Sequence, residues 1–177
     1  MMQLQSRKIA EISIFSAAAV VIYVVETFIP RPLPWMRFGF GNIIVLLSLY
    51  LLGFRAGLIV AGLKSILGAL VVGSLFTPSF LFSISGGLIS LIVMALILTA
   101  IPRVFSPLGI SLWGALTHNL TQLFIASLLF IGRVEVLHLL PFFIILSVIT
   151  GSITGTISLL VLKRVSIKDH LKMQTSA

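Results

Sequence analysis

RAGLIVAGLKSILGALVVGS, residues 55–74, is apolar along almost its whole length and has enough residues to cross a bilayer as a helix. Lys64 is the one charged side chain within its interior. Small residues recur every four positions, at Gly57, Ala61, Ser65, Ala69 and Gly73. Because lipid tails are as apolar as leucine, helices in a membrane associate through such small faces, where backbones approach closely. The segment therefore predicts a transmembrane helix that packs through one face.

Five further apolar segments are separated by glycine, proline and charged residues, at 8–29, 41–53, 78–101, 107–131 and 137–163. Together they predict an all-α membrane protein of six transmembrane helices in a single domain spanning 1–177, with a polar tail at 165–177. The segment 41–53 holds about 13 residues and reaches roughly 20 Å, so we expect the preceding loop to complete its outer end. Small residues in 137–163, at Ser147, Gly151 and Gly155, favour packing within the chain over docking of a partner.

The composition excludes an ordinary soluble domain. Of 177 residues, 59% are hydrophobic and 9% are charged, which leaves too few polar groups to cover a soluble surface. The absence of cysteine excludes disulfides, thiolate metal sites and cysteine nucleophiles. Four scattered acids and no Walker A, H-E-x-x-H or G-x-S-x-G motif argue against an enzyme, a metal site or a cofactor. Single bases at the ends of apolar runs also argue against nucleic-acid binding.

The distribution of lysine and arginine predicts the orientation. Eight of the twelve bases fall on the side of the two termini: Arg7, Lys8, Arg55, Arg103, Lys163, Arg164, Lys168 and Lys172. Three fall on the other side, at Arg31, Arg37 and Arg133. By the positive-inside rule, both termini are expected in the cytoplasm of a bacterial cell, with the chain in its plasma membrane.

Polar residues inside the membrane are costly and therefore candidates for function. Lys64 lies about 14 Å along its helix from Arg55, near the bilayer centre. Either it snorkels or pairs with carbonyl groups, or it binds an anion. Inside segment 107–131, one stretch of five residues contains His118, Asn119 and Gln122. Thr117 and Thr121 lie beside them. A single histidine in a membrane helix usually makes a hydrogen bond to a neighbouring helix. The cluster of three polar side chains favours a ligand site instead.

The loop after the first segment contains Pro30, Pro32 and Pro34, together with Trp35, which suits a membrane interface. We expect an ordered flap. Glu26 should lie near Arg31 or Arg37, and a structural ion pair would explain it. Alternatively, the flap gates an outward-facing cavity, with Asn42 contributing its amide.

Several short motifs occur in a fixed order: RFGFGN at 37–42, YLLGFR at 50–55, the Lys64 helix, SISGG at 83–87 and HNLTQ at 118–122. This set resembles the Gx transporter family, often labelled heptaprenyl diphosphate synthase component I, over residues 8–164. That family in turn looks like the substrate-binding S components of energy-coupling factor (ECF) transporters. S components have six helices, both ends inside, and a first loop that covers an outward pocket.

The resemblance implies a subunit that binds a small micronutrient or precursor and docks on an ECF-type transmembrane coupling protein served by two ATPases. The implied pocket comprises Arg37, Asn42, Ser83, Ser85, His118, Asn119 and Gln122. Lys64 and Glu26 would serve anion binding or coupling. The nearest match to an AxxxA docking face is Ser13 with Ala17. The surplus of cationic groups favours an anionic or amphipathic aromatic substrate.

A different class of protein is also compatible with these residues: a non-catalytic accessory membrane protein of isoprenoid or quinone metabolism, or of a membrane redox chain. A carrier predicts an outer polar cavity that holds Asn42, His118 and Gln122 together. An accessory protein predicts that neighbouring helices satisfy these side chains and that any cleft is apolar and open to lipid.

Overall fold

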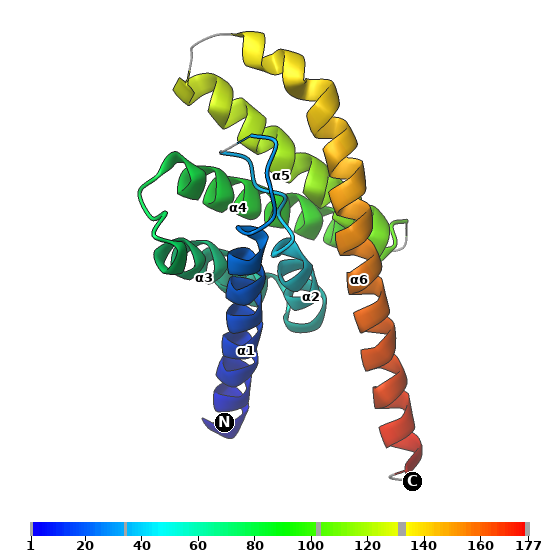
Figure 1. Cartoon of the computed structure of the whole chain (residues 1–177). Helices are drawn as coiled ribbons and strands as arrows, with labels where there is room; N and C mark the ends of the chain where they lie inside the picture. The colour runs from blue at the N-terminus through cyan, green and yellow to red at the C-terminus, as the bar shows by residue number, and fades with distance from the viewer. Residues whose placement is uncertain (1, 34, 102–103, 131–133, 176–177) are drawn as a thin grey trace.

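The computed structural model describes residues 2–33, 35–101, 104–130 and 134–175, and every regular element within these ranges is a helix (Figure 1). Pro34, Arg103 and Arg133, which the sequence analysis used, lie outside the described residues. The elements are α1 (Met2–Glu26), α2 (Asn42–Leu52), α3 (Phe54–Val72), α4 (Pro78–Ala100), α5 (Pro107–Phe130), the 3-10 helix η1 (Val134–Leu139) and α6 (Leu140–Thr175).

Four helical stretches in the described part of the chain are long and apolar enough to cross a membrane: Ser6–Glu26, Phe54–Val72, Pro78–Ala100 and Val136–Val165. They give the chain the character of a multi-pass membrane protein. α2 is apolar but shorter, at 11 residues. α5 has 24 residues, but His118, Asn119 and Gln122 reduce its apolar character. Six crossings therefore stay a prediction.

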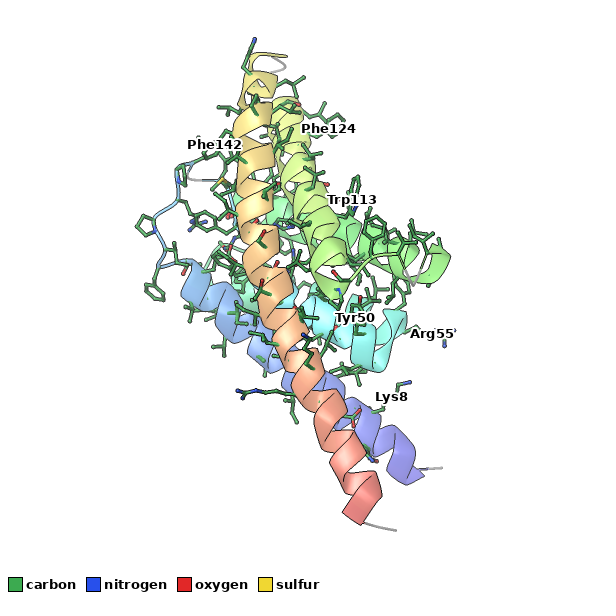
Figure 2. The ribbon with its side chains drawn as sticks, turned by 90° about the vertical axis from the view of Figure 1, so that its right-hand side faces the viewer. Lys8, Tyr50, Arg55, Trp113, Phe124 and Phe142 are labelled. Carbon is green, nitrogen blue, oxygen red and sulfur yellow. The ribbon has the colours of Figure 1, made fainter. Side chains whose placement is uncertain are left out.

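The helices pack in two groups, which are joined where α3 contacts α4 and where α2 contacts α6. α1 packs on α3 and α2, while α5 packs between α4 and α6. Figure 1 shows the two termini at one end of the molecule and the loop after α1 toward the opposite end. Figure 2 shows Lys8 and Arg55 pointing outward in the lower half of the view, and Trp113, Phe124 and Phe142 above them. Large apolar side chains on the outside suit a protein surrounded by lipid.

Two helix boundaries differ from the predicted ones. α1 ends at Glu26 and not near residue 29, because Thr27–Ile29 form turns in which their N–H groups donate to carbonyls three residues earlier. Prolines follow directly and cannot continue the helix. At the other end of the chain, α6 continues to Thr175, so most of the predicted polar tail is helical. Residues 165–175 contain no glycine or proline to end a helix.

The small-residue faces pack inside the bundle, as predicted. Ala61, Ser65 and Ala69 on α3 are buried. On α6, a Cβ atom added at Gly151 or Gly155 would lie 2.9 Å from Leu112 Cα or 2.8 Å from Leu108 Cα. The α6 backbone therefore lies directly against the α5 backbone, an approach that only glycine permits.

Gly68→Ala is expected to destabilise the bundle, because a Cβ atom at Gly68 would overlap the ring of Tyr23 where α3 meets α1. An overpacked core position typically costs about 1–3 kcal/mol. Gly62→Ala on the same helix is the matched control, since nothing lies within 4 Å of a Cβ atom there. Thermal unfolding in detergent should show a lower Tm for Gly68→Ala alone. An equal Tm for the two variants would contradict the expectation.

Candidate functional site

Residues 27–33 and 35–41, here called the lid, cover a group of buried polar side chains from α1, α3 and α5. The lid is anchored first by apolar contacts. The Trp35 ring lies 5.7 Å from the Phe143 ring on α6 and 5.2 Å from the Phe82 ring on α4, measured between centroids. Met36 is fully buried in a cluster with Leu123 and Phe143. The lid is thus the ordered flap that its prolines predict, and it fills space between helices.

Gln122 holds the lid through its backbone. The Arg37 backbone N–H donates to Gln122 Oε1 at 2.8 Å, and Gln122 Nε2 donates to the Arg37 carbonyl oxygen at 2.9 Å. The side-chain amide therefore pairs with the lid as a neighbouring peptide group would. Gln122 is fully buried, so these bonds are shielded from water.

Glu26 holds the lid two residues beyond Arg37. Its carboxylate oxygens accept hydrogen bonds from the backbone N–H groups of Gly39, at 3.1 Å, and Phe40, at 2.9 Å. The predicted ion pair with Arg31 or Arg37 is wrong: within the described ranges, the ion pair found joins Arg7 to Glu11 on the surface. Two successive N–H groups form a concave donor site, which satisfies a carboxylate without a cation.

The Arg37 side chain is buried beneath the lid. Its guanidinium carbon lies 3.7 Å from the centre of the Tyr23 ring, and Nε donates to Ser79 Oγ at 3.4 Å. Nη1 is buried without a hydrogen-bond partner. Burial lowers the pKa of the Arg37 guanidinium from its usual value, while Tyr23 and Glu26 act in the opposite direction. Arginine nevertheless stays charged in proteins, so the lid carries a cation into the bundle.

Lys64 and Asn42 form a second polar contact next to the lid. Lys64 Nζ donates to Asn42 Oδ1 at 2.6 Å, and Lys64 is 2% exposed. A Cβ atom at Gly41 would lie 2.8 Å from Lys64 Cδ, so the lid backbone presses on the lysine stem. Lys64 therefore does not snorkel to the membrane surface but pairs with the carbonyl oxygen of the Asn42 side chain, and anion binding stays a prediction.

His118 lies between the lid and α4. A Cβ atom at Gly39 would lie 3.0 Å from His118 Nε2, and one at Gly86 would lie 2.7 Å from Nδ1. Neither ring nitrogen makes a hydrogen bond of regular geometry, although Nδ1 faces the Gly86 backbone. Gly39 has φ 82°, so glycine is favoured there by conformation as well as by space.

The remaining predicted residues lie in different places. Asn119 Nδ2 donates to Ser147 Oγ at 2.9 Å, so it joins α5 to α6. Ser83 is buried on α4. Ser85 donates to the Leu81 carbonyl oxygen and lines a surface groove between α4 and α5, away from the lid. Ser13 and Ala17 are exposed on α1, where a partner could reach them.

The interior beneath the lid is closed. The cavity next to Gly39 and Asn42 has a volume of about 10 Å³, enough for roughly one water molecule. Larger hollows lie on the outer surface, such as a groove of about 220 Å³ between α5 and α6 beside Trp113. The structure thus places Asn42, His118 and Gln122 around one segment of the lid, without the open polar cavity that a carrier predicts.

Sequence reasoning missed Tyr23 and Ser79, which hold the Arg37 side chain. Tyr23 lies three residues before Glu26 on α1, so both side chains share one helix face. The three-residue spacing from Glu26 could therefore have identified Tyr23 from the sequence. No local pattern could have identified Ser79, because its partner Arg37 is 42 residues away.

A family model described as heptaprenyl diphosphate synthase component I matches residues 15–161, most of the chain. The chain belongs to this family. The resemblance drawn from the ordered motifs is therefore confirmed. Neither a curated protein nor a solved structure matches the chain. In this member of the component I family, the matched residues include α2 to α5 and the whole lid.

Proposed function

We propose that the chain is a solute-binding membrane subunit, like an S component, that takes up a small micronutrient or precursor with an ATP-driven coupling module. Arg37, Asn42, Ser83, His118, Asn119 and Gln122 would form the binding site, whereas Ser85 lies in a surface groove outside it. Ser13 and Ala17, exposed on α1, would dock on the coupling protein. The subunit would lie in a bacterial plasma membrane with both termini cytoplasmic.

The observation that carries the proposal is the lid. Its backbone is held by Gln122 and Glu26, two buried side chains on helices that enclose it. Beneath it, Arg37 Nη1 and the His118 nitrogens are left without regular partners. Buried polar groups without partners destabilise a membrane protein, and helix packing alone does not require them. A site that opens to a ligand supplies their partners.

The cavity next to Gly39 and Asn42 has room for about one water molecule, so the lid is closed over the site in this structure. Binding would require the lid to lift and its apolar anchors at Trp35 and Met36 to leave their contacts. A ligand would then take over hydrogen bonds that the lid backbone makes in the closed structure.

The test is native mass spectrometry of gently purified protein, searching for a co-purifying solute. His118→Ala is expected to lose this solute with a smaller fall in Tm than Gln122→Ala, because it leaves a cavity but breaks no regular hydrogen bond. The control is His138→Ala, which removes an exposed histidine in η1. This variant should retain the solute. Equal loss of solute and of stability in His118→Ala would favour a packing role.

One observation favours a second function, that of a non-catalytic accessory protein in isoprenoid or quinone metabolism. Most of the predicted site residues are satisfied inside the bundle, and the groove between α5 and α6 is apolar, lined by Leu112, Trp113, Leu116, Ile144 and Val148. Such a groove would suit a prenyl tail. Retention of an isoprenoid and no water-soluble compound in the same mass spectra would support this function.

A further inference from the structure

Four ionisable side chains lie buried beneath or beside the lid: Glu26, Arg37, Lys64 and His118, each at most 4% exposed. They are close enough to interact electrostatically. Arginine and lysine contribute two positive charges and Glu26 one negative charge. These three side chains therefore sum to one net positive charge.

None of these charges is directly paired within the described residues. Lys64 donates to a neutral amide oxygen, and Arg37 rests on the Tyr23 ring and a serine hydroxyl. The Glu26 carboxylate is occupied by lid N–H groups. A buried charge without a counter-charge destabilises a protein strongly, and more so within a membrane.

The three charged side chains lie on separate parts of the structure, so the net charge of the cluster depends on the position of the lid. Lys64 and Glu26 belong to helices α3 and α1, whereas Arg37 belongs to the lid. In the closed position the lid holds the Arg37 cation near Lys64 and Glu26, and no further carboxylate reaches them within the described residues.

We propose that the ligand carries a single anionic group, a carboxylate or phosphate on a water-soluble solute, and that this group drives closure of the lid by neutralising the cluster. This inference rests on the proposed function and names its ligand class. The group binds near Lys64 Nζ, Asn42 and His118, and Arg37 covers it as the lid returns. Gly87 on α4 lies against this site, since a Cβ atom there would be in van der Waals contact with Lys64 Nζ at 3.6 Å.

Trp35 provides a direct measure of lid closure. The chain has two tryptophans, and Trp113 lies exposed on the outside of α5, so Trp113→Phe leaves Trp35 as the reporter. Trp35 is partly buried in the closed lid, so neutral acrylamide quenches it to a limited extent there and more strongly when the lid lifts from Phe82 and Phe143. In this background, Lys64→Gln removes the surplus charge but keeps a polar group beside Asn42. We expect the quenching constant of the empty protein to fall about threefold, because the closed lid is stabilised.

The controls separate this effect from a general change of charge. Lys8→Gln removes an exposed cation and should leave quenching unchanged. If Lys64→Gln does not fold, Lys64→Met keeps the apolar stem against Gly41 and replaces it in the comparison. Equal quenching of the Lys64 variant and its parent would overturn the inference, because it would mean that Lys64 carries no unpaired charge in the closed site. A Trp35 quenching constant that stays at the parent value even in Gln122→Ala, which removes the side chain that holds the lid backbone, would instead overturn the proposed function, since no lid would open.

A second comparison tests the ligand class and its source. Benzoate and inorganic phosphate are compared with neutral benzamide, in nanodiscs of phosphatidylcholine. We expect an anion to reduce Trp35 quenching in the parent protein, and not in Lys64→Gln. Equal protection by benzamide would contradict an anionic ligand. Protection that appears only when phosphatidylglycerol replaces phosphatidylcholine, without dissolved anion, would assign the anion to a lipid headgroup and overturn the solute.

Discussion

Gln122→Ala is expected to release the lid and to lower the free energy of unfolding by about 3 kcal/mol. The variant leaves both the N–H and the carbonyl group of Arg37 without their partner in a buried place. It should therefore lower stability more than His118→Ala does, as well as affect ligand binding. The Tm in detergent measures the first effect.

Limited digestion with trypsin measures release of the lid. Arg31 is followed by Pro32, which blocks cleavage, so the bond after Arg37 is the one in the lid that trypsin can cut. Arg37 is 3% exposed in the closed structure and should be protected in the parent protein. Gln122→Ala should release a fragment of residues 1–37 much faster.

Two further variants serve as comparisons for the trypsin digestion of Gln122→Ala. Thr121→Ala changes the neighbouring residue, whose hydroxyl donates to the Thr117 carbonyl oxygen within α5, and should behave like the parent. Gln122→Glu keeps an acceptor for the Arg37 N–H but loses the donor to the Arg37 carbonyl oxygen, so it should be intermediate. If Gln122→Ala resists trypsin as well as Thr121→Ala does, Trp35 and Met36 hold the lid without the amide.

The double variant Gly151→Ala, Gly155→Ala is expected to separate α6 from α5 and to destabilise the bundle by about 4 kcal/mol. Each added methyl group would meet the α5 backbone, at Leu112 Cα and Leu108 Cα, where no side chain can rotate away. α6 also supplies Phe143, which stacks on Trp35, and Ser147, which accepts from Asn119. Separation should therefore loosen the lid too.

Thermal unfolding and the same trypsin digestion check this expectation together. Gly62→Ala on α3 changes a glycine in the middle of a helix to alanine where space is open, and should not lower the Tm. If the double variant unfolds at the same temperature as Gly62→Ala, α5 and α6 are held by other contacts, such as the hydrogen bond between Ser111 and Thr154.

Local patterns predicted most of the fold. The apolar segments are helices, the four-residue spacing of small residues marks buried faces, and the prolines at 30 and 32 mark an ordered loop. Boundaries were less accurate, because turns after Glu26 and a helical C-terminal stretch depend on context and not on hydropathy. Polarity within α5 was enough to single out His118, Asn119 and Gln122.

The partners of these side chains could not be predicted. Gln122 binds the backbone of a residue 85 positions away, and any residue type presents the same N–H and carbonyl groups. For Glu26, opposite charge predicted an arginine, whereas the structure supplies two backbone N–H groups. Residue identity reveals which side chains need a partner in a membrane, but not which backbone will reach them.

The attachment of the lid through main-chain atoms has an evolutionary consequence. Gln122 and Glu26 contact peptide groups of Arg37, Gly39 and Phe40, so the fastening does not depend on the side chain at position 40, nor on that of Phe38 between the two attachment points. Substitutions at these two positions would therefore leave the attachment of the lid intact. Under the carrier function proposed above, a lineage built on this bundle would be able to change its ligand by point substitution in one short loop.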